Sequence, residues 1–361
     1  MDEQTRQDTI RSCLQVSAGL LTIPAMLLLI AAIYLTHLRL TWLNPDFLKR
    51  VPTRNKIYDQ LPEMILDGIL EEAAFSSGES GLIEEFENTL GRESLEALME
   101  AVIPPEWIRE QVELNIDAFF AFLNRDTPYP YFLVQTSVLQ DHATSEEVRN
   151  ALIDLFANLP PCEWDEDFFR GDIPRCRPPD AILDELVNEA AFSLRGIFPV
   201  DFSFDEIIAT EDNQEQMLSD FEKVQWGYRF FNWMIWGVWL AYLLLMGIIV
   251  LIFSSSLEKA LLWAGWPTLA GSGIALIGFA AFMILVPLLA KNWLTQLPPD
   301  SPVRLARNFV SILTACNLDF QGAGLLVSGI PAILSALAVA GSVLLRRFQG
   351  APYEGIPEDW M

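Results

Sequence analysis

The chain has 361 residues, of which 52% are hydrophobic and 20% charged, with a formal net charge of −25 and a mean hydropathy of +0.28. This acidity argues against nucleic acid and anionic lipid head groups as partners, because both are polyanions. The charge is concentrated: residues 40–228 hold 39 of the 48 acidic residues but 13 of the 23 basic ones, a net charge of −26. A large acidic domain is therefore joined to a nearly neutral, apolar remainder.

The N-terminal segment, residues 1–15, is short and polar, and an apolar run over residues 16–37 follows it. Twenty consecutive residues of this run carry no charge, which is enough helix to cross a hydrocarbon core about 30 Å thick. The run continues into His37 and Arg39 without a small-x-small cleavage site, so we predict an uncleaved signal anchor. Three further spans are predicted at residues 229–254, 260–290 and 322–345, and the one at residues 260–290 begins with an interfacial lead-in.

The acidic block, residues 38–228, shows mostly helical periodicity interrupted by prolines. Helices are predicted over residues 61–74, 93–102, 105–126, 145–157 and 180–194. Residues 131–138 are β-branched and aromatic and predict a strand, and residues 198–204 predict a second strand that could pair with it. The predicted fold class is a membrane α-helical protein with four transmembrane helices. A mostly α (α+β) extracytoplasmic domain with a small strand pair lies between the first and second.

The predicted orientation places the N-terminus and the tail, residues 346–361, in the cytoplasm. Basic residues favour the cytoplasmic side of a membrane. In this orientation the inner side carries Arg6, Arg11, Lys259, Arg346 and Arg347, and the outer loop, residues 291–321, carries Lys291, Arg304 and Arg307. That loop also has the pattern of an amphipathic helix. The predicted localisation is a multi-pass cell-membrane protein with its large domain extracytoplasmic.

Cys162 and Cys176 flank a polar loop within the acidic block. A disulfide that closes a loop of about 15 residues contributes roughly 3 kcal/mol in the chain-entropy model. A zinc site would need more ligands than two cysteines, and no histidine is near. We therefore predict a Cys162–Cys176 disulfide, which implies an oxidising compartment for the acidic block.

Candidate ligand and catalytic patterns are weak. The loop acids Glu163, Asp165, Glu166 and Asp167 could bind a cation such as calcium, but they lack an Asp-x-Asp-x-Asp-Gly pattern, and a solvated acidic face explains them more simply. The two histidines, His37 and His142, lie outside any HExxH pattern, and GxSxG, P-loop and GxGxxG motifs are absent from the sequence. We predict no catalytic, cofactor-binding or metal-binding residues, and a protein that is not an enzyme.

The apolar runs of the predicted spans, which in the second span cover residues 230–253, contain no Asp, Glu, Lys or Arg, although proton relays and ion paths usually need such groups. The fourth span instead has a small residue at every fourth position, namely Gly324, Ser328, Ala332, Ala336 and Ala340. Such a strip lets another helix approach closely. It predicts either the packing seam of the four helices or a docking face for a partner span.

Three phrases carry a family resemblance: IPPEWIREQVELNIDAFFAFLNRD, LPPCEWDEDFFRGDIPRCRPP and LLWAGWPTLAGSGIALIGF. With this span order, they resemble uncharacterised bacterial four-span integral membrane proteins. In topology alone, one span followed by a large outer domain and three spans is similar to FtsX- or MacB-type permease subunits. That likeness implies transmission of conformational change from a cytoplasmic ATPase.

These patterns predict a non-enzymatic integral membrane protein that presents an acidic extracytoplasmic domain for protein interaction, as a structural or assembly subunit of a membrane complex. The alternative is a permease-like subunit that couples a cytoplasmic ATPase to the outer domain. Expected partners are membrane lipid and other membrane or extracytoplasmic proteins, including further copies of the chain. Neither a cofactor nor nucleic acid is expected.

Overall fold

The structure is a computed structural model that describes residues 3–77, 89–161, 169–170, 173–174, 176–198, 201–203, 214–254, 256–296 and 303–348. The chain divides into two compact units. The span unit comprises residues 1–44, 227–288 and 317–361, and the acidic unit comprises residues 45–226 and 289–316. The acidic unit lies mostly within the predicted acidic block, residues 38–228, and includes residues 289–316 besides.

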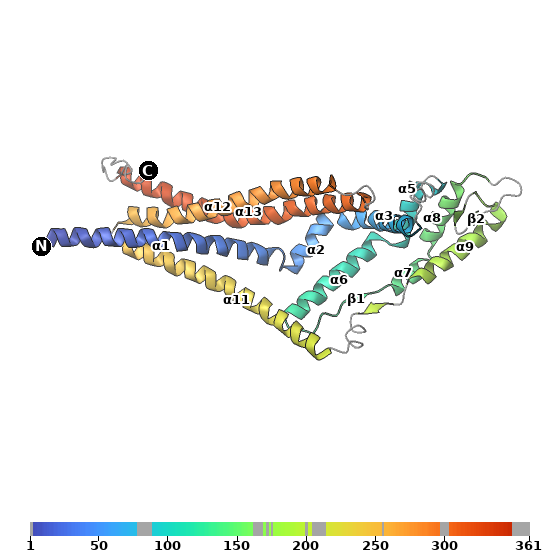
Figure 1. Cartoon of the computed structure of the whole chain (residues 1–361), viewed down its shortest axis with the longest axis horizontal. Coiled ribbons are helices and arrows are strands. Elements are labelled where there is room, and N and C mark those ends of the chain that lie inside the picture. Colours follow the sequence, from blue (N-terminus) through green and yellow to red (C-terminus); the bar gives the residue numbers. More distant parts are fainter. Residues whose placement is uncertain are drawn as a thin grey trace. The chain divides into compact units, whose positions relative to one another are not determined.

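Four long helices, α1 (Glu3–Leu40), α11 (Gln214–Ile252), α12 (Leu257–Leu294) and α13 (Val303–Phe348), are long and apolar enough to cross a membrane. This confirms the predicted number of apolar spans. Each helix extends beyond its predicted span because polar helical sequence continues from the apolar run. In particular, α12 includes the predicted interfacial lead-in, and α13 joins the predicted amphipathic loop helix to the fourth span without a break (Figure 1).

Small residues let the helices of the span unit approach closely. A Cβ atom at Gly271 would lie 3.2 Å from the Met26 carbonyl oxygen on α1, and one at Gly265 would lie 2.8 Å from Val339 Cγ2 on α13. Trp239 on α11 donates a 2.9 Å hydrogen bond from Nε1 to Thr36 Oγ1 on α1. Without a hydrophobic force between helices in lipid, such close packing and interhelical hydrogen bonds hold a bundle together.

The acidic unit is built mainly from short helices around one apolar core. Its helices are α2 (Pro45–Arg54), α3 (Ile57–Ser77), α5 (Arg92–Val102), α6 (Pro105–Leu123), α7 (Ser137–His142), α8 (Glu146–Ala157) and α9 (Asp180–Ile197). Core side chains come from α3, α5, α8 and α9, with Val148 and Val187 fully buried. The helix starts follow local chemistry. Pro105 occupies the first turn of α6, and the Ser145 hydroxyl accepts a 3.3 Å hydrogen bond from Val148 N at the start of α8.

The strands of the acidic unit are two residues long. β1 (Leu133–Val134) pairs antiparallel with β4 (Phe202–Ser203), and β2 (Phe169–Arg170) pairs antiparallel with β3 (Ile173–Pro174). The predicted strand over residues 131–138 is too long, because its second half turns into α7. The start of α7 is held from a distant part of the chain, since Ser137 N donates a 2.7 Å hydrogen bond to Asp201 Oδ1. That hydrogen bond lowers the pKa of Asp201.

Polar side chains of α6 clamp the other edge of the β1 segment. Asn115 donates through Nδ2 to Leu133 O at 2.8 Å and accepts through Oδ1 from Leu133 N at 2.9 Å. One and two turns earlier on the same helix, Gln111 accepts from Gln135 N and Trp107 donates to Gln135 O. The amides thus replace a neighbouring strand, which is why so short a β1 is stable.

We expect Asn115→Leu to destabilise the acidic unit by about 2 kcal/mol, because the Leu133 N–H and C=O groups lose their partners while still part-buried. Hydrogen exchange at residues 133–135 measures the effect directly. Asn150→Leu, at an exposed position on α8 of the same unit, is a matched control. Equal exchange at residues 133–135 in both variants would contradict the clamp.

Candidate functional site

A carboxylate on α3, Asp67, is the most deeply buried acidic side chain among the described residues, with 2% of its surface exposed. Arg92 on α5 donates to Asp67 Oδ1 at 2.9 Å, and Asn308 on α13 donates from Nδ2 to Asp67 Oδ2 at 3.1 Å. Arg92 also forms ion pairs with Glu63 and Glu96. This Asp67 cluster joins three helices of the acidic unit through one side chain.

The geometry of the Asp67 cluster is that of a structural clamp. Both carboxylate oxygens already accept hydrogen bonds from fixed donors, and an ionised carboxylate has only acceptor capacity. A general base needs an oxygen within hydrogen-bond reach of a substrate proton. Breaking such a buried pair leaves an uncompensated charge, so the cluster favours one arrangement of α3, α5 and α13.

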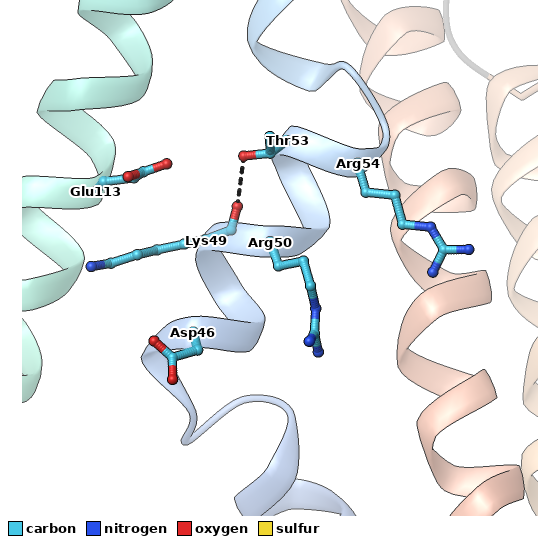
Figure 2. A pocket seen from close by; sticks show the side chains of 6 residues that line it. All are labelled: Asp46, Lys49, Arg50, Thr53, Arg54 and Glu113. Atoms are coloured by element: carbon cyan, nitrogen blue, oxygen red, sulfur yellow. Dashed lines mark hydrogen bonds between the residues drawn. The ribbon is translucent and has the colours of Figure 1, made fainter.

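A second polar feature is a shallow hollow of about 370 Å³ beside α2 (Figure 2). It is lined by Asp46, Lys49, Arg50, Thr53, Arg54 and Glu113. Lys49 points toward α6, where it pairs with Asp117, whereas Arg50 and Arg54 point away from Glu113 (Figure 2). Thr53 Oγ1 donates to Lys49 O at 3.0 Å within the helix. Acidic and basic side chains thus line the hollow together.

An apolar hollow of about 410 Å³ lies on the α6 side of α2. Its walls are mainly apolar side chains of α2, α6 and the β1 segment: Leu48, Val112, Ile116, Phe119, Phe120, Phe132 and Val134. The aromatic rings at its end pack on one another, with Phe119 stacked on Phe132 at 6.3 Å between centroids. Gln111 and Asn115 also line it, but their side chains are committed to the β1 clamp.

Tyr58, on α3, is buried, and its hydroxyl has no hydrogen-bond partner within the part of the chain that the structure describes. Burial, followed by the negative charge of Glu113, raises the pKa of the phenol, while Arg109 lowers it. The folded-state pKa is raised above the unfolded value. The resulting stabilisation is therefore complete below the unfolded pKa, near pH 10, and is lost as pH rises through the folded pKa.

We expect Tyr58→Phe to increase the free energy of unfolding at pH 7 by about 1 kcal/mol, because an unpaired buried hydroxyl is removed. The free energy of unfolding of the variant should also fall less than that of the wild type as the pH rises above 10, because Tyr58 no longer titrates. Unfolding followed by urea at pH 7 and at pH 10.5 measures both effects. A variant less stable than the wild type at pH 7 would show that the hydroxyl is paired.

Most residues of the predicted disulfide loop lie outside the described part of the chain, including Cys162, Glu163, Asp165, Glu166 and Asp167. Cys176 is described and is buried. Its pairing with Cys162 stays a prediction, because Cys162 lies outside the described residues. Of the histidines, His37 is buried near the end of the α1 span, and His142 closes α7, with Nε2 3.7 Å from Glu147 Oε2. The described residues contain no group of three His, Cys, Asp or Glu placed to hold a metal ion.

The structure divides the predicted strip on the fourth span. Gly324 and Ser328 are buried, and Gly324 faces the ring of Phe279 on α12. Beyond Pro331 the buried positions shift to Ser335 and Ser342, while Ala332 is half-buried and Ala336 and Ala340 are exposed. The buried serines are seven residues apart, so this side of α13 follows a heptad spacing that a four-residue count misses.

Neither polar feature of the acidic unit was predicted from the sequence. The Asp67 cluster joins residues as far as 241 positions apart and has no local pattern. The basic side of α2 does have a sequence signal: residues 49–56 contain Lys49, Arg50, Arg54 and Lys56 and no acid, within a block of net charge −26. Averaging the charge over the whole block concealed it.

The chain has no match among protein-family models, among curated proteins or among solved structures. The resemblance to four-span bacterial membrane proteins therefore remains a prediction.

Proposed function

We propose that the chain is a non-enzymatic subunit of a bacterial membrane complex that holds its acidic unit outside the cytoplasm as a protein-interaction surface. The observation that carries this proposal is the use of the buried carboxylate. Both carboxylate oxygens of Asp67 accept hydrogen bonds, from Arg92 and Asn308, that hold helices together. The abundant surface carboxylates are therefore the acidic groups that the unit presents to a partner. A surface of this charge attracts basic protein partners and accelerates their association.

Exposed apolar side chains on α9 add to this support. Phe192 is 70% exposed and Ile197 is 71% exposed, among the largest values in the acidic unit. Large apolar side chains rimmed by charge are typical of protein-interaction sites. The partner expected for α9 is a protein with an apolar anchor and a basic rim.

Site-specific photo-crosslinking in cells tests this role. A photoreactive phenylalanine analogue at position 192 or 197 should give a discrete crosslinked product with another protein, and 0.5 M NaCl should weaken it. The same analogue at Val187, which is fully buried on the same helix, is the control. Absence of a product at both exposed positions, or an equal product at Val187, would contradict an interaction surface on α9.

The orientation belongs to the proposal and rests on the predicted disulfide and on the basic residues of the short connections. Non-reducing mass spectrometry of the protein from an oxidising compartment is expected to find Cys162 joined to Cys176. The reason is that seven of the 13 residues between them are charged, so the loop has few apolar groups with which to order itself. Free thiols at both positions would argue for a cytoplasmic acidic unit.

A second role is favoured by the continuity of two helices. α11 and α13 each extend as a single helix from residues of the acidic unit into residues of the span unit. A rigid helix of this kind could transmit a conformational change, as in a permease-like subunit that works with a cytoplasmic ATPase. Mild-detergent purification distinguishes the two roles, because the permease-like role requires an ATPase in the isolated complex.

A further inference from the structure

We propose that Pro287 makes α12 a hinged helix, and that the side-chain amide of Asn317 on α13 is the latch that holds this hinge in one position. Both residues belong to the span unit. The device is conformational, and it is independent of the proposed protein-interaction role.

Pro287 interrupts the hydrogen bonding of α12, which is helical on both sides of it. In an α-helix the carbonyl of residue 283 accepts a hydrogen bond from the N–H of residue 287. Proline has no N–H, and its ring pushes against that same carbonyl. The oxygen of Met283 therefore receives no hydrogen bond from position 287, and the helix bends most easily at this turn.

Asn317 supplies a donor to this carbonyl from the neighbouring helix. Its Nδ2 atom donates a hydrogen bond of 3.3 Å to the oxygen of Met283. The Asn317 side chain is 7% exposed, and Gln321, one turn further along α13, donates from Nε2 to its Oδ1 atom at 3.3 Å. A proline is tolerated inside a span when a neighbouring helix satisfies the carbonyl that it frees. The Asn317 amide thus ties the Pro287 turn of α12 to α13.

The surroundings of Pro287 leave room for a bend, whereas those of Pro267, the other proline of α12, do not. Pro267 is buried between two glycines that lie against other helices. A Cβ atom at Gly265 would lie 2.8 Å from a side-chain atom of α13, and one at Gly271 would lie 3.2 Å from a backbone oxygen of α1. Beside Pro287, in contrast, Leu288 is 58% exposed. The hinge is therefore assigned to Pro287 alone.

The hinge and the latch lie where the chain passes between the two units. α12 leaves the span unit after residue 288, and α13 enters it at Asn317. A change of bend at Pro287 therefore changes the direction in which α12 leaves the span unit. Opening the latch costs one hydrogen bond between helices, so a partner that binds one direction more tightly would shift the balance.

Double electron–electron resonance on the full-length protein tests the hinge. Nitroxide labels are placed at Ile277→Cys and Asn292→Cys, two exposed positions of α12 on opposite sides of Pro287, and the native cysteines outside the predicted disulfide are replaced by serine. Asn317→Leu should broaden the distribution of distances between the labels. Pro287→Ala should restore a narrow distribution in that variant, because the alanine N–H closes the helix at Met283. A distribution as narrow in Asn317→Leu as in the natural chain would overturn the hinge.

A double-mutant cycle tests the latch through the equilibrium constant for folding in mixed micelles. In the natural chain Asn317→Leu should lower this constant about fivefold, the size of a hydrogen bond between spans. In a Pro287→Ala chain the loss should be less than about twofold, since the carbonyl of Met283 then has a partner within α12. The bond from Gln321 is lost equally in both chains, so its contribution cancels. If leucine prevents assembly, Asn317→Ala takes its place in the same cycle.

Pro331→Ala on α13 is the matched control for the cycle, because it also replaces a proline inside a span. Pro331 lies about 21 Å along the helix from Asn317, so the two changes should be independent. The fivefold loss for Asn317→Leu should therefore persist in the Pro331→Ala chain. An equal loss in all three chains would show that Asn317 contributes without satisfying the carbonyl of Met283, and would overturn the latch.

Discussion

Replacing Arg92 with methionine is expected to lower the free energy of unfolding of the acidic unit by about 3 kcal/mol, because the buried carboxylate of Asp67 loses its charge partner. Within the described residues, Asp67 would then keep the hydrogen bond from Asn308 alone. Methionine retains most of the aliphatic volume of arginine, so the loss reports mainly the charge. Hydrogen exchange in α3 and α5, measured on the full-length protein, is the direct readout.

Two variants control for the Arg92 result. Glu63→Gln removes an exposed partner of the same arginine and should cost less than about 1 kcal/mol, as surface ion pairs do. The double variant Asp67→Leu/Arg92→Met removes both the buried carboxylate and its partner and should recover part of the lost stability. If Arg92→Met proves no more costly than Glu63→Gln, the Asp67 cluster does not hold the helices together.

The second large effect is expected in the span unit, where Gly324→Leu should destabilise the packing of α12 on α13 by about 2–3 kcal/mol through overpacking. A Cβ atom at this position would lie 2.7 Å from Cγ of Phe279. The Phe279 ring cannot move aside easily. It is 2% exposed and packs against Tyr34 and His37 at centroid distances of 4.8 and 4.7 Å. The melting temperature in detergent, followed by size-exclusion chromatography, measures the effect.

Gly329→Leu is the matched control on the same helix, because an added Cβ there meets no atom within 4 Å. It should leave the melting temperature nearly unchanged. Ala336→Leu tests whether the small-residue strip is a docking face for a partner span. Ala336 is exposed in this chain, so the substitution should leave the stability of the isolated protein unchanged and weaken only its association with a partner helix. A loss of stability at Gly329 equal to that at Gly324 would refute the close approach to Phe279.

Features set by local sequence were predictable. Long uncharged runs gave the four spans, since only helices of that length satisfy their backbone in lipid. The helix α6 was predicted from its apolar face and its leading prolines, and α8 from Thr144 or Ser145 ahead of Glu147, of which the structure has Ser145 as the cap. Each of these signals lies within one or two helical turns.

Features set by contacts between distant residues could not be predicted from the sequence. The start of α7 depends on Asp201, 64 residues further on, and this contact ends a segment that propensity alone predicts as strand. The buried side of α13 follows Ser328, Ser335 and Ser342 because Pro331 and the α12 surface determine which side faces inward. Counting small residues along the sequence takes account of neither the proline nor the neighbouring helix.

The central claim, that the acidic unit is held outside the cytoplasm, is tested most directly by cysteine labelling in intact cells. Cys13 and Cys316 are first replaced by serine, and single cysteines are introduced at Glu185 on α9 or at Ser254, after α11, both exposed. A membrane-impermeant maleimide is expected to label Glu185→Cys in intact cells and Ser254→Cys only after permeabilisation. The reverse pattern would place the acidic unit in the cytoplasm and contradict the proposed function.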